Sequence, residues 1–455
     1  MVDPMLQTGQ TDFPTSNGTR VSASCLEIRA YRMLTRLARP AAPYILRFRE
    51  RKGKEDPSRL GERLGRASIV RPEGPVVWVH AASVGETSAV LPLISELAVR
   101  RPEVTTLLTT GTVTSARFAE SRLRSSNVHQ YVPLDEPSFV SAFLDHWRPC
   151  LGIFTEQEVW PNLVLAATAR RIPLVLVNAR MSDRSFDRWQ RYSTLSTALF
   201  SRFDMVLAQN EALARRFEQI GAQHVMAVGN LKIDAPPPPV DADTLAAIEH
   251  ALAGIPRIVA ASTHEGEEKV VAEAHIAAKR ELAGLVTLIA PRHPDRGEAV
   301  GDAAASLGLS VRRRSLGEWP EKGTDIYVCD TIGELGTLYA ASSVAFIGGS
   351  LITHGGQNPI EAVHHDAAVL TGPSTHNFSD AYSALFQAGG AVQVGAADQL
   401  AQATVDLIAR PLQAEAMRGN ARRALAQLSG ALEQTLLAIS PLLPGGNGRQ
   451  LATGG

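Results

Sequence analysis

The sequence predicts an α/β protein built from two doubly wound, Rossmann-like domains with a ligand cleft between them. Three observations support this prediction. The chain has 455 residues, which suggests two or three domains at roughly 150 residues each. From residue 75 onward, short β-rich runs alternate with helical patterns, as in parallel sheets that are covered on both faces. A proline-rich segment at 235–239 interrupts the alternation near the middle of the chain.

Composition narrows the class of protein. Hydrophobic residues make up 45% and charged residues 20% of the chain, which is ordinary for a globular protein. The 45 basic and 46 acidic side chains give no overall field for nucleic acid, and aromatic residues at 5% argue against a base-stacking surface. Cys25, Cys150 and Cys329 are far apart and fit neither a disulfide framework nor a zinc site. Because no secretory signal and no apolar run of about 18 residues occur, we expect a cytosolic protein.

The N-terminal part is expected to be a disordered tail over residues 1–24, followed by a basic amphipathic segment over residues 25–66. Between Ile28 and Arg66 there are twelve basic and four acidic residues. Apolar residues recur there near helical spacing, with arginines between them. Such a helix can lie on an anionic membrane surface, or it can pack on the first domain with its arginines in water. We interpret the segment as membrane-proximal.

The first domain is expected over residues 67–235. Its strands are predicted at the glycine-bounded, β-rich runs Val76–Ala81, Val104–Thr109, Leu151–Thr155, Leu174–Asn178, Met205–Ala208 and His224–Val228. The helical patterns between these strands are Thr87–Arg100, Ser138–Trp147, Pro161–Arg171 and Glu211–Gly221.

A linker is expected over residues 236–243, because a run of prolines fits neither a helix nor a central strand. The alternation then restarts in a second domain over residues 244–440, followed by a flexible tail over 441–455. Strands are predicted at Arg257–Ala261, Leu285–Ala290, Ser310–Arg313, Ile326–Cys329, Val344–Ile347 and Ala367–Leu370. Helices are predicted at Glu265–Leu282, Asp295–Leu307, Leu335–Ala341, Pro359–His365 and after Asp398.

Two acidic loops follow strands of the first domain. Glu86 comes after the first strand, in Ser83-Val84-Gly85-Glu86, at the start of a helix. Its carboxylate either complements the helix dipole or acts as a general base on a hydroxyl acceptor. Glu156 and Glu158 follow another strand beside Trp160, where a single acidic residue would suffice as a cap. Because ligands bind at the carboxyl ends of parallel strands, both loops are candidate sites.

Basic and glycine-rich loops follow other strands. Lys232 comes after the last strand of the first domain, and Arg292 with His293 comes after a strand of the second. These side chains suit an anionic ligand, or they are simply solvated. The loop 348–361 brings backbone N–H groups to the start of a helix, which suits a nucleotide phosphate, and Glu361 suits the hydroxyls of a ribose. The loop has neither Walker nor GxGxxG spacing.

No metal ion or other cofactor is expected. His364 and His365 are neighbours on a helical pattern, so their side chains point in different directions and cannot easily share one ion. The sequence has no HExxH or CxxC motif and no paired aspartates for a metal-bound sugar nucleotide. We therefore expect a metal-independent reaction.

Seven motifs lie in order along the chain: Ser83–Glu86, Glu156–Asn162, Asn178–Ser182, Gly229–Lys232, Ser262–Glu268, Pro291–His293 and Gly355–Glu361. Together they resemble the 3-deoxy-D-manno-octulosonic acid (Kdo) transferases, which are inverting GT-B glycosyltransferases of lipopolysaccharide synthesis. The resemblance runs from about Arg59 to Tyr382. Three departures are mild, since Val159, Gln357 and Ile360 stand where the family commonly has Leu, His and Leu. A more consequential departure is the N-terminal part, where many relatives have a hydrophobic membrane helix and this sequence has an arginine-rich amphipathic segment.

The resemblance implies transfer of Kdo from CMP-Kdo to lipid IVA, a lipid A precursor, with release of CMP. It implies Glu86 as the general base, and Glu156 and Lys232 as stabilisers of the transition state. It carries contacts to the CMP of the donor over to Pro291, Arg292, Gly333, Glu334, Leu335, Asn358, Pro359, Ile360 and Glu361. The first domain would then bind the acceptor and the second the donor. The basic segment would attach the protein peripherally to the cytoplasmic face of the inner membrane.

Two other functions stay open from the sequence. One is a different GT-B enzyme, such as a UDP-sugar transferase or a UDP-GlcNAc 2-epimerase, which a nucleotide-binding assay would separate. The other is a two-domain ligand-binding protein of the periplasmic type. That protein would need an export signal and would have no use for Glu86.

Overall fold

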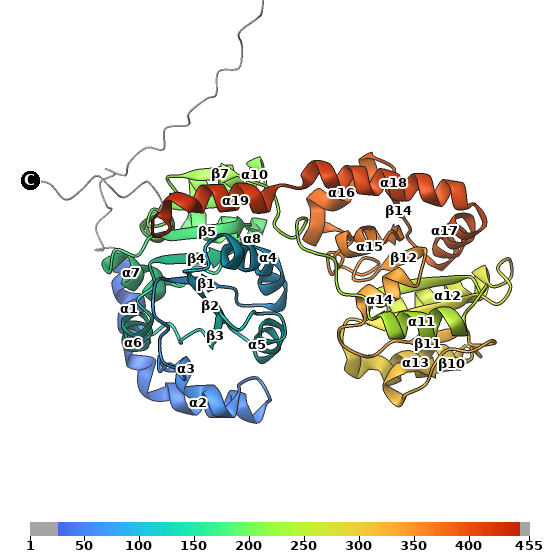
Figure 1. Ribbon diagram of the computed structural model, residues 1–455, viewed down its shortest axis with the longest axis horizontal. Helices are drawn as coiled ribbons and strands as arrows, with labels where there is room; N and C mark the ends of the chain where they lie inside the picture. The colour runs from blue at the N-terminus through green and yellow to red at the C-terminus, as the bar shows by residue number, and fades with distance from the viewer. Residues whose placement is uncertain (1–25, 446–455) are drawn as a thin grey trace, which may run out of the picture. The chain divides into compact units, whose positions relative to one another are not determined.

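The computed structural model describes residues 26–445. The tail expected over residues 1–24, and the part of the C-terminal tail after residue 445, lie outside the described residues. Contacts divide the chain into two compact units (Figure 1). The first unit contains the chain up to Val228 together with the residues from Thr435 onward, and the second contains Gly229–Gln434.

The first unit is built on a seven-stranded parallel sheet in the order β3-β2-β1-β4-β5-β6-β7. Its strands are β1 (Val76–His80), β2 (Thr105–Thr110), β3 (Val128–Tyr131), β4 (Leu151–Thr155), β5 (Leu174–Ala179), β6 (Met205–Ala208) and β7 (Val225–Ala227). Its helices around the sheet are α4 (Val84–Arg100), α5 (Val113–Glu120), α6 (Pro137–Trp147), α7 (Pro161–Ala169), α8 (Asp183–Arg191), α9 (Ser193–Phe200) and α10 (Glu211–Gln219). Helices α4 and α5 lie on one face of the sheet, and α6 and α7 lie on the other (Figure 1).

Aromatic packing holds β1 and β4 under α6. The fully buried ring of Trp78 meets Phe143 of α6 and Phe154 of β4 edge-on, with ring centroids 5.1 and 4.9 Å apart. Such edge-to-face pairs add about 0.5–1.5 kcal/mol each beyond the burial of their area. These contacts therefore hold β1 and β4, the strands that precede the two acidic loops, in place against α6.

The N-terminal segment forms α1 (Leu26–Ala38), a 3₁₀ turn (Arg39–Ala41), α2 (Ala42–Arg51) and α3 (Leu60–Arg63). Several large apolar side chains of this segment are exposed, namely Leu26, Met33, Leu34, Leu37, Tyr44, Ile45 and Phe48. The predicted amphipathic helix is thus present, in two pieces joined by the turn. None of the helices over residues 26–445 combines the length and apolar character that crossing a membrane requires.

The second unit repeats the same architecture, with a seven-stranded parallel sheet in the order β10-β11-β9-β8-β12-β13-β14. Its strands are β8 (Arg257–Thr263), β9 (Val286–Pro291), β10 (Val311–Arg313), β11 (Ile326–Val328), β12 (Val344–Ile347), β13 (Ala368–Thr371) and β14 (Ala391–Gln393). Its helices are α11 (Ala242–Ala251), α12 (Glu267–Ala278), α13 (Gly297–Ser306), α14 (Leu335–Ala340), α15 (Ile360–His364), α16 (Ser379–Gln387), α17 (Ala397–Ala409) and α18 (Pro411–Leu428). The last helix, α19 (Ala431–Ile439), contains the point where the chain returns to the first unit.

Alternate side chains of β8 pack into two separate hydrophobic cores. Ile258 and Ala260 pack with residues of α12, α13 and α17, whereas Val259 and Ala261 pack with residues of α11, α14 and α15. This alternation is the two-residue period of a strand that is buried on both faces. The predicted fold class, two doubly wound α/β units, is confirmed.

The patterns missed one strand in each unit. β3 contains His129 and Gln130 among its four residues, and two of the three residues of β14 are exposed. Both are edge strands, which are half paired and do not need a continuous apolar run. An apolar periodicity therefore could not reveal them.

The boundary between the units differs from the expected linker at 236–243. Pro238 packs on the second unit, because its carbonyl oxygen lies 2.9 Å from His365 Nε2. Asp241 caps α11 by accepting a hydrogen bond from the N–H of Thr244 at 2.8 Å. The prolines thus belong to the ordered part of the second unit, and the division falls before them, at Gly229.

The part of the expected C-terminal tail that the structure describes is ordered. Ser440–Leu442 forms a 3₁₀ turn, and Leu443 is buried. The guanidinium of Arg101 donates a hydrogen bond to the carbonyl of Pro444. These residues pack with the first unit, so the expectation of a tail starting at 441 is wrong over 441–445.

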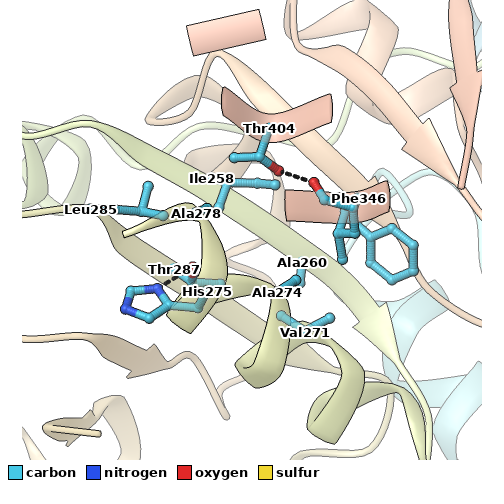
Figure 2. Close-up of a pocket in the computed structure, with 11 residues that line it drawn as sticks. Ile258, Ala260, Val271, Ala274, His275, Ala278, Leu285, Thr287, Phe346 and Thr404 are labelled. Atoms are coloured by element: carbon cyan, nitrogen blue, oxygen red, sulfur yellow. Dashed lines mark hydrogen bonds between the residues drawn. The ribbon is translucent and has the colours of Figure 1, made fainter. Parts of the chain in front are cut away.

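A small void lies in the core of the second unit between β8, β9 and α12 (Figure 2). Its volume is about 10 Å³, which is at the lower limit for one water molecule. Ile258, Val271 and Leu285 line it with apolar atoms, and His275 at its edge is hydrogen-bonded to Thr287 at 2.9 Å (Figure 2). We regard it as a packing imperfection rather than a ligand site.

Candidate active site

The acidic residues of the first unit lie at the ends of two neighbouring strands. The loop after β1 leads through Ser83 and Glu86 into α4, and Glu156 and Glu158 follow β4 directly. β1 pairs with β4 in parallel, and the chain winds away from this pair in opposite directions. This is the topological switch point of the sheet, where doubly wound folds bind their ligands.

Glu86 closes the start of α4 with its own carboxylate. Its backbone N–H donates to Ser83 Oγ at 3.3 Å, and that hydroxyl donates to Glu86 Oε1 at 2.8 Å. The N–H of Ala82 donates to Glu86 Oε2 at 2.8 Å. This arrangement resembles a capping box, so Glu86 has the structural role that its position suggests. A chemical role must rest on a further property.

That further property is a raised pKa. Burial raises the pKa of Glu86 to about 7, and the charges of Glu158 and Glu156 add to the shift against its hydrogen bonds. Burial also raises the pKa of Glu158. A carboxyl group that titrates near neutral pH is matched to general-base work, because it can both take and release a proton there.

Backbone strain marks the ends of three strands. Glu156 after β4 has φ 57°, Asn178 in β5 has φ 51° and Ser262 in β8 has φ 55°. A left-handed conformation costs of order 1–3 kcal/mol for a residue that is not glycine, and such strain is concentrated at ligand sites. For Glu156 it aims the carboxylate to within 3.9 Å of Arg180 Nε.

Sequence reasoning missed His80, the last residue of β1. Its ring is fully buried, with Nδ1 3.0 Å from Thr109 Oγ1 and Nε2 4.0 Å from Glu158 Oε2. Burial lowers the pKa of His80 to about 4, so the ring is neutral at pH 7. The available signal was a histidine inside an otherwise apolar strand, directly before an acidic loop.

In the second unit, the glycine-rich loop after β12 approaches other backbone segments closely. A Cβ atom at Gly348 would lie 2.6 Å from Ser262 O, and one at Gly356 would lie 2.9 Å from Ser374 O. Gly349 and Gly356 also have positive φ angles of 68° and 73°. The loop therefore needs glycine at these positions for its path.

Glu267 was also missed, although it holds this loop in place. The carboxylate is fully buried and accepts hydrogen bonds from four backbone N–H groups. These donors are His264, Gly349, Ser350 and Leu351, at 2.9, 2.6, 2.9 and 2.9 Å. One side chain thus ties the end of β8 to the end of β12, the neighbouring strands at the switch point of this sheet.

Histidines surround the same loop. The rings of His264 and His354 have centroids 4.1 Å apart, and Gln357 Nε2–H donates to His264 Nε2 at 3.0 Å. Burial lowers the pKa of His264, which is consistent with the neutral ring that this hydrogen bond requires. The site therefore places the neutral ring of His264 beside the glycine-rich loop.

Arg292, Asn358 and Glu361 come together beside the loop. Asn358 Nδ2 donates to Glu361 Oε1 at 3.1 Å, and Asn358 Oδ1 accepts from the N–H of Ile360 at 3.1 Å. Burial raises the pKa of Glu361, while the nearby charge of Arg292 lowers it. Arg292 itself is exposed and available to an anion, and Pro291 before it is buried at the end of β9.

Glu334, a predicted contact to the CMP of the donor, and Lys232, a predicted stabiliser of the transition state, have different surroundings. Glu334, between Gly333 and Leu335, forms an ion pair with Arg314, whose Nη2 lies 2.8 Å from Glu334 Oε1. Lys232 belongs to the second unit and not to the first, because its neighbour Ile233 is buried in the second core. Lys232 Nζ lies 5.6 Å from the ring centre of Phe378.

No group of three or more metal-ligating side chains is present among residues 26–445. The two clusters are instead distinct in chemistry. The first unit gathers Glu86, Glu156 and Glu158, and the second gathers glycine N–H groups with Arg292, Asn358 and Glu361.

Comparison with known proteins identifies similar chains. Residues 58–235 match the family described as 3-deoxy-D-manno-octulosonic-acid transferase (kdotransferase). The chain is 35% identical over 400 residues to the 3-deoxy-D-manno-octulosonic acid transferase of Bordetella pertussis, covering 85% of this chain and 91% of that one. It is 32% identical over 395 residues to the transferase of the same name from Haemophilus influenzae, covering 85% and 91%.

A solved structure supports the fold. A glycosyltransferase from Rickettsia africae matches with a TM-score of 0.56 and 13% identity, over 82% of this chain and 100% of that one. At this identity the likeness shows the GT-B fold alone.

Proposed function

Because the chain belongs to the 3-deoxy-D-manno-octulosonic acid transferase family, we propose that it transfers Kdo from CMP-Kdo to lipid IVA and releases CMP. The proposal assigns the acceptor to the first unit and the donor to the second. The observation that carries it is Glu86, a carboxylate with a pKa of about 7 at the switch point of the first sheet.

In the proposed reaction, Glu86 takes the proton from the attacking hydroxyl of the acceptor. The hydroxyl oxygen forms a bond to the anomeric carbon of Kdo while the bond from that carbon to the CMP phosphate breaks, with inversion. General-base help of this kind contributes about 10²–10⁴-fold. Glu156, whose backbone is held in a strained conformation, stabilises the positive charge that develops on the sugar.

The leaving phosphate needs positive charge and hydrogen-bond donors. Arg292 is exposed, and its guanidinium supplies both a positive charge and hydrogen-bond donors beside the glycine-rich loop that Glu267 holds. Lys232 is a further cation of the second unit and stabilises the transition state in this proposal. The hydrogen-bonded pair of Asn358 and Glu361 suits the hydroxyls of the ribose.

The acceptor lipid would be reached from the membrane. We propose that α1 and α2 attach the protein peripherally to the cytoplasmic face of the inner membrane, since they carry exposed apolar side chains next to arginines such as Arg32 and Arg36. Roughly 1 kcal/mol per basic residue near an anionic surface makes the basic segment sufficient for attachment. We propose that the reaction needs no metal ion.

The experiment that tests this function is release of CMP from fresh CMP-Kdo, with and without lipid IVA in detergent. We expect release that depends on lipid IVA and a lipid product that carries Kdo. Absence of both would refute the proposed substrates and direct a screen to UDP-sugars, which the alternative GT-B transferases and epimerases use.

A further inference from the structure

A cavity of about 540 Å³ in the first unit is not used by the proposed reaction. It lies between α1, the turn after α1, and helices α6 and α7. The charged and amide side chains that line it are Arg32, Arg36, Arg39, Glu136, Asn162 and Arg170. These elements lie side by side along one face of the first sheet (Figure 1).

The cavity carries an excess of positive charge. Arg32, Arg36 and Arg39 form no ion pair with any residue over 26–445, whereas Arg170 is paired with Asp145 at 2.7 Å. The single carboxylate in the wall, Glu136, is occupied as the cap of α6. It accepts hydrogen bonds from the N–H groups of residues 138 and 139 at 2.9 and 3.1 Å. Three guanidinium groups therefore lack a protein anion in this cavity.

The arginines are presented by a helix that is fixed from behind. Tyr31 donates its hydroxyl proton to Asp135 Oδ2 at 2.9 Å, and Asn162 Nδ2 donates to Thr35 Oγ1 at 3.2 Å. Ile28 is 1% exposed and packs in a small apolar cluster with residues of α7 and α9. α1 therefore cannot rotate to carry its arginines away, and their orientation is a property of the folded unit.

An apolar stripe runs along α1 next to these arginines. Arg32 and Arg36 are four residues apart and share one face, since residues of an α-helix advance by about 100°. Met33 and Leu37 follow them by one position each, and they are 58% and 69% exposed. The order around the helix is thus a buried side, an arginine row and an exposed apolar row. A molecule with an anionic head and an apolar tail matches this order.

We propose that this cavity binds the phosphate headgroup of an anionic phospholipid of the membrane. The guanidinium groups of the cavity arginines donate hydrogen bonds to the phosphate oxygens, and Met33 and Leu37 lie along the acyl chains. The inference deepens the membrane attachment in the proposed function and rests on it. In this proposal the protein binds the membrane at one defined headgroup site, in addition to the general attraction between its basic residues and an anionic surface.

The test compares two double variants with equal loss of charge. Arg32→Gln with Arg36→Gln removes two cations from the cavity. Arg29→Gln with Arg47→Gln removes two exposed cations of the same segment that do not line the cavity, and it is the control. Sedimentation of full-length protein is measured with phosphatidylcholine vesicles that contain either phosphatidic acid or, at the same surface charge, oleate.

For the cavity variant we expect about a tenfold or larger loss of binding to the phosphatidic acid vesicles, and only a few-fold loss for the control. The unaltered protein should prefer phosphatidic acid to oleate, and the cavity variant should lose that preference. Equal losses in both variants, or no preference for phosphate over carboxylate, would overturn the proposal.

A second measurement separates the acceptor from the bulk membrane as the occupant. CMP release is followed in detergent micelles without phospholipid, as a function of lipid IVA concentration. We expect the cavity variant to retain the KM and kcat of the unaltered protein there. A selective rise in KM would make the acceptor the occupant and overturn a membrane phospholipid. Failure of all CMP release would contradict the proposed function, while the vesicle measurement would still decide the cavity.

Discussion

The two units share a seven-stranded parallel sheet with one switch point and differ in what they place there. In the first unit, the loops after β1 and β4 present three carboxylates, and a helix cap holds one of them, Glu86. In the second, the loops after β8 and β12 present glycines and histidines, an exposed arginine follows β9, and one buried carboxylate ties the backbone together. The scaffold is common, so the chemistry is decided by short loops that the scaffold positions.

The two units differ most in the role that a carboxylate has near the switch point. Glu86 is partly exposed and raised in pKa, so that it can exchange a proton with a substrate. Glu267 is fully buried and surrounded by four N–H donors, so that it shapes a loop and meets no solvent. Burial by itself does not identify a catalytic acid or base; the number of satisfied hydrogen bonds and the access to solvent do.

The largest expected effect is loss of the proton acceptor in the first unit. Glu86→Gln should lower CMP release in the presence of lipid IVA by about 10²–10⁴-fold. Binding of CMP should be unchanged, because the proposed nucleotide site lies in the second unit. Gln can still accept the hydrogen bond from Ala82, so the helix cap persists. Glu96→Gln on the same helix is the control and should keep full activity.

Steady-state kinetics and calorimetric titration with CMP check both parts of this prediction. Retained turnover in Glu86→Gln would remove the general base from the mechanism. A parallel loss of CMP binding would contradict the proposal that the first unit binds the acceptor and the second unit binds the donor.

The next effect concerns the loop of the second unit. Glu267→Gln replaces one acceptor oxygen by an NH₂ group, which would face two of the four N–H donors, either those of residues 264 and 349 or those of residues 350 and 351. Buried donors without a partner cost about 1–3 kcal/mol each, so affinity for CMP should fall by at least about tenfold. Glu265→Gln, an exposed neighbour, is the matched control. Unchanged CMP affinity in Glu267→Gln would show that the loop does not bind the nucleotide.

The pH dependence of turnover tests the role of Glu86 as a general base and its interaction with Glu158. Since the pKa of Glu86 is about 7, kcat should rise with pH through 7 as the base becomes ionised. Glu158→Gln removes a negative charge that raises this pKa, so the rise should move to lower pH. A profile that stays in place in Glu158→Gln would mean that the two carboxylates do not interact.

The smallest effect is on stability. Burial raises the folded-state pKa of Glu86 from its ordinary value of 4.5 to about 7, so the folded state loses stability as pH rises from 4.5 through 7. Glu86→Gln removes this loss and should stabilise the protein by about 1 kcal/mol at pH 8, with the difference shrinking toward pH 4.5. Thermal melts at several pH values measure it. A lower melting temperature for the variant at pH 8 would mean that capping outweighs charge burial.

Much of the fold was predictable from the sequence because central parallel strands are buried on both faces. β1 and β12 are continuous apolar runs that end at a loop, which makes both the strand and its functional end visible. The edge strands β3 and β14 lack that constraint and were missed. The proline run at 236–239 suggested a boundary that tertiary packing on the second unit overrides.

The site divides in the same way. Glu86, Glu156 and Arg292 could be selected from the sequence, because Glu156 and Arg292 directly follow strands and Glu86 lies in the first turn of the helix after β1. The roles of Glu267 and His80 depend on partners distant in sequence, such as Ser350 and Glu158. The spacing of residues along the sequence does not indicate such distant partners, so the folded structure is needed to identify them.

The return of the chain to the first unit has a consequence for its synthesis. About 200 residues, from Gly229 to Gln434, separate the bulk of the first unit from the residues that complete it. At a synthesis rate of about 5–20 residues per second, that is a delay of about 10–40 s. During this interval the second unit can finish folding, while the surface that later receives Ile439 and Leu443 stays uncovered. The unit that emerges first from the ribosome is therefore the last to be completed.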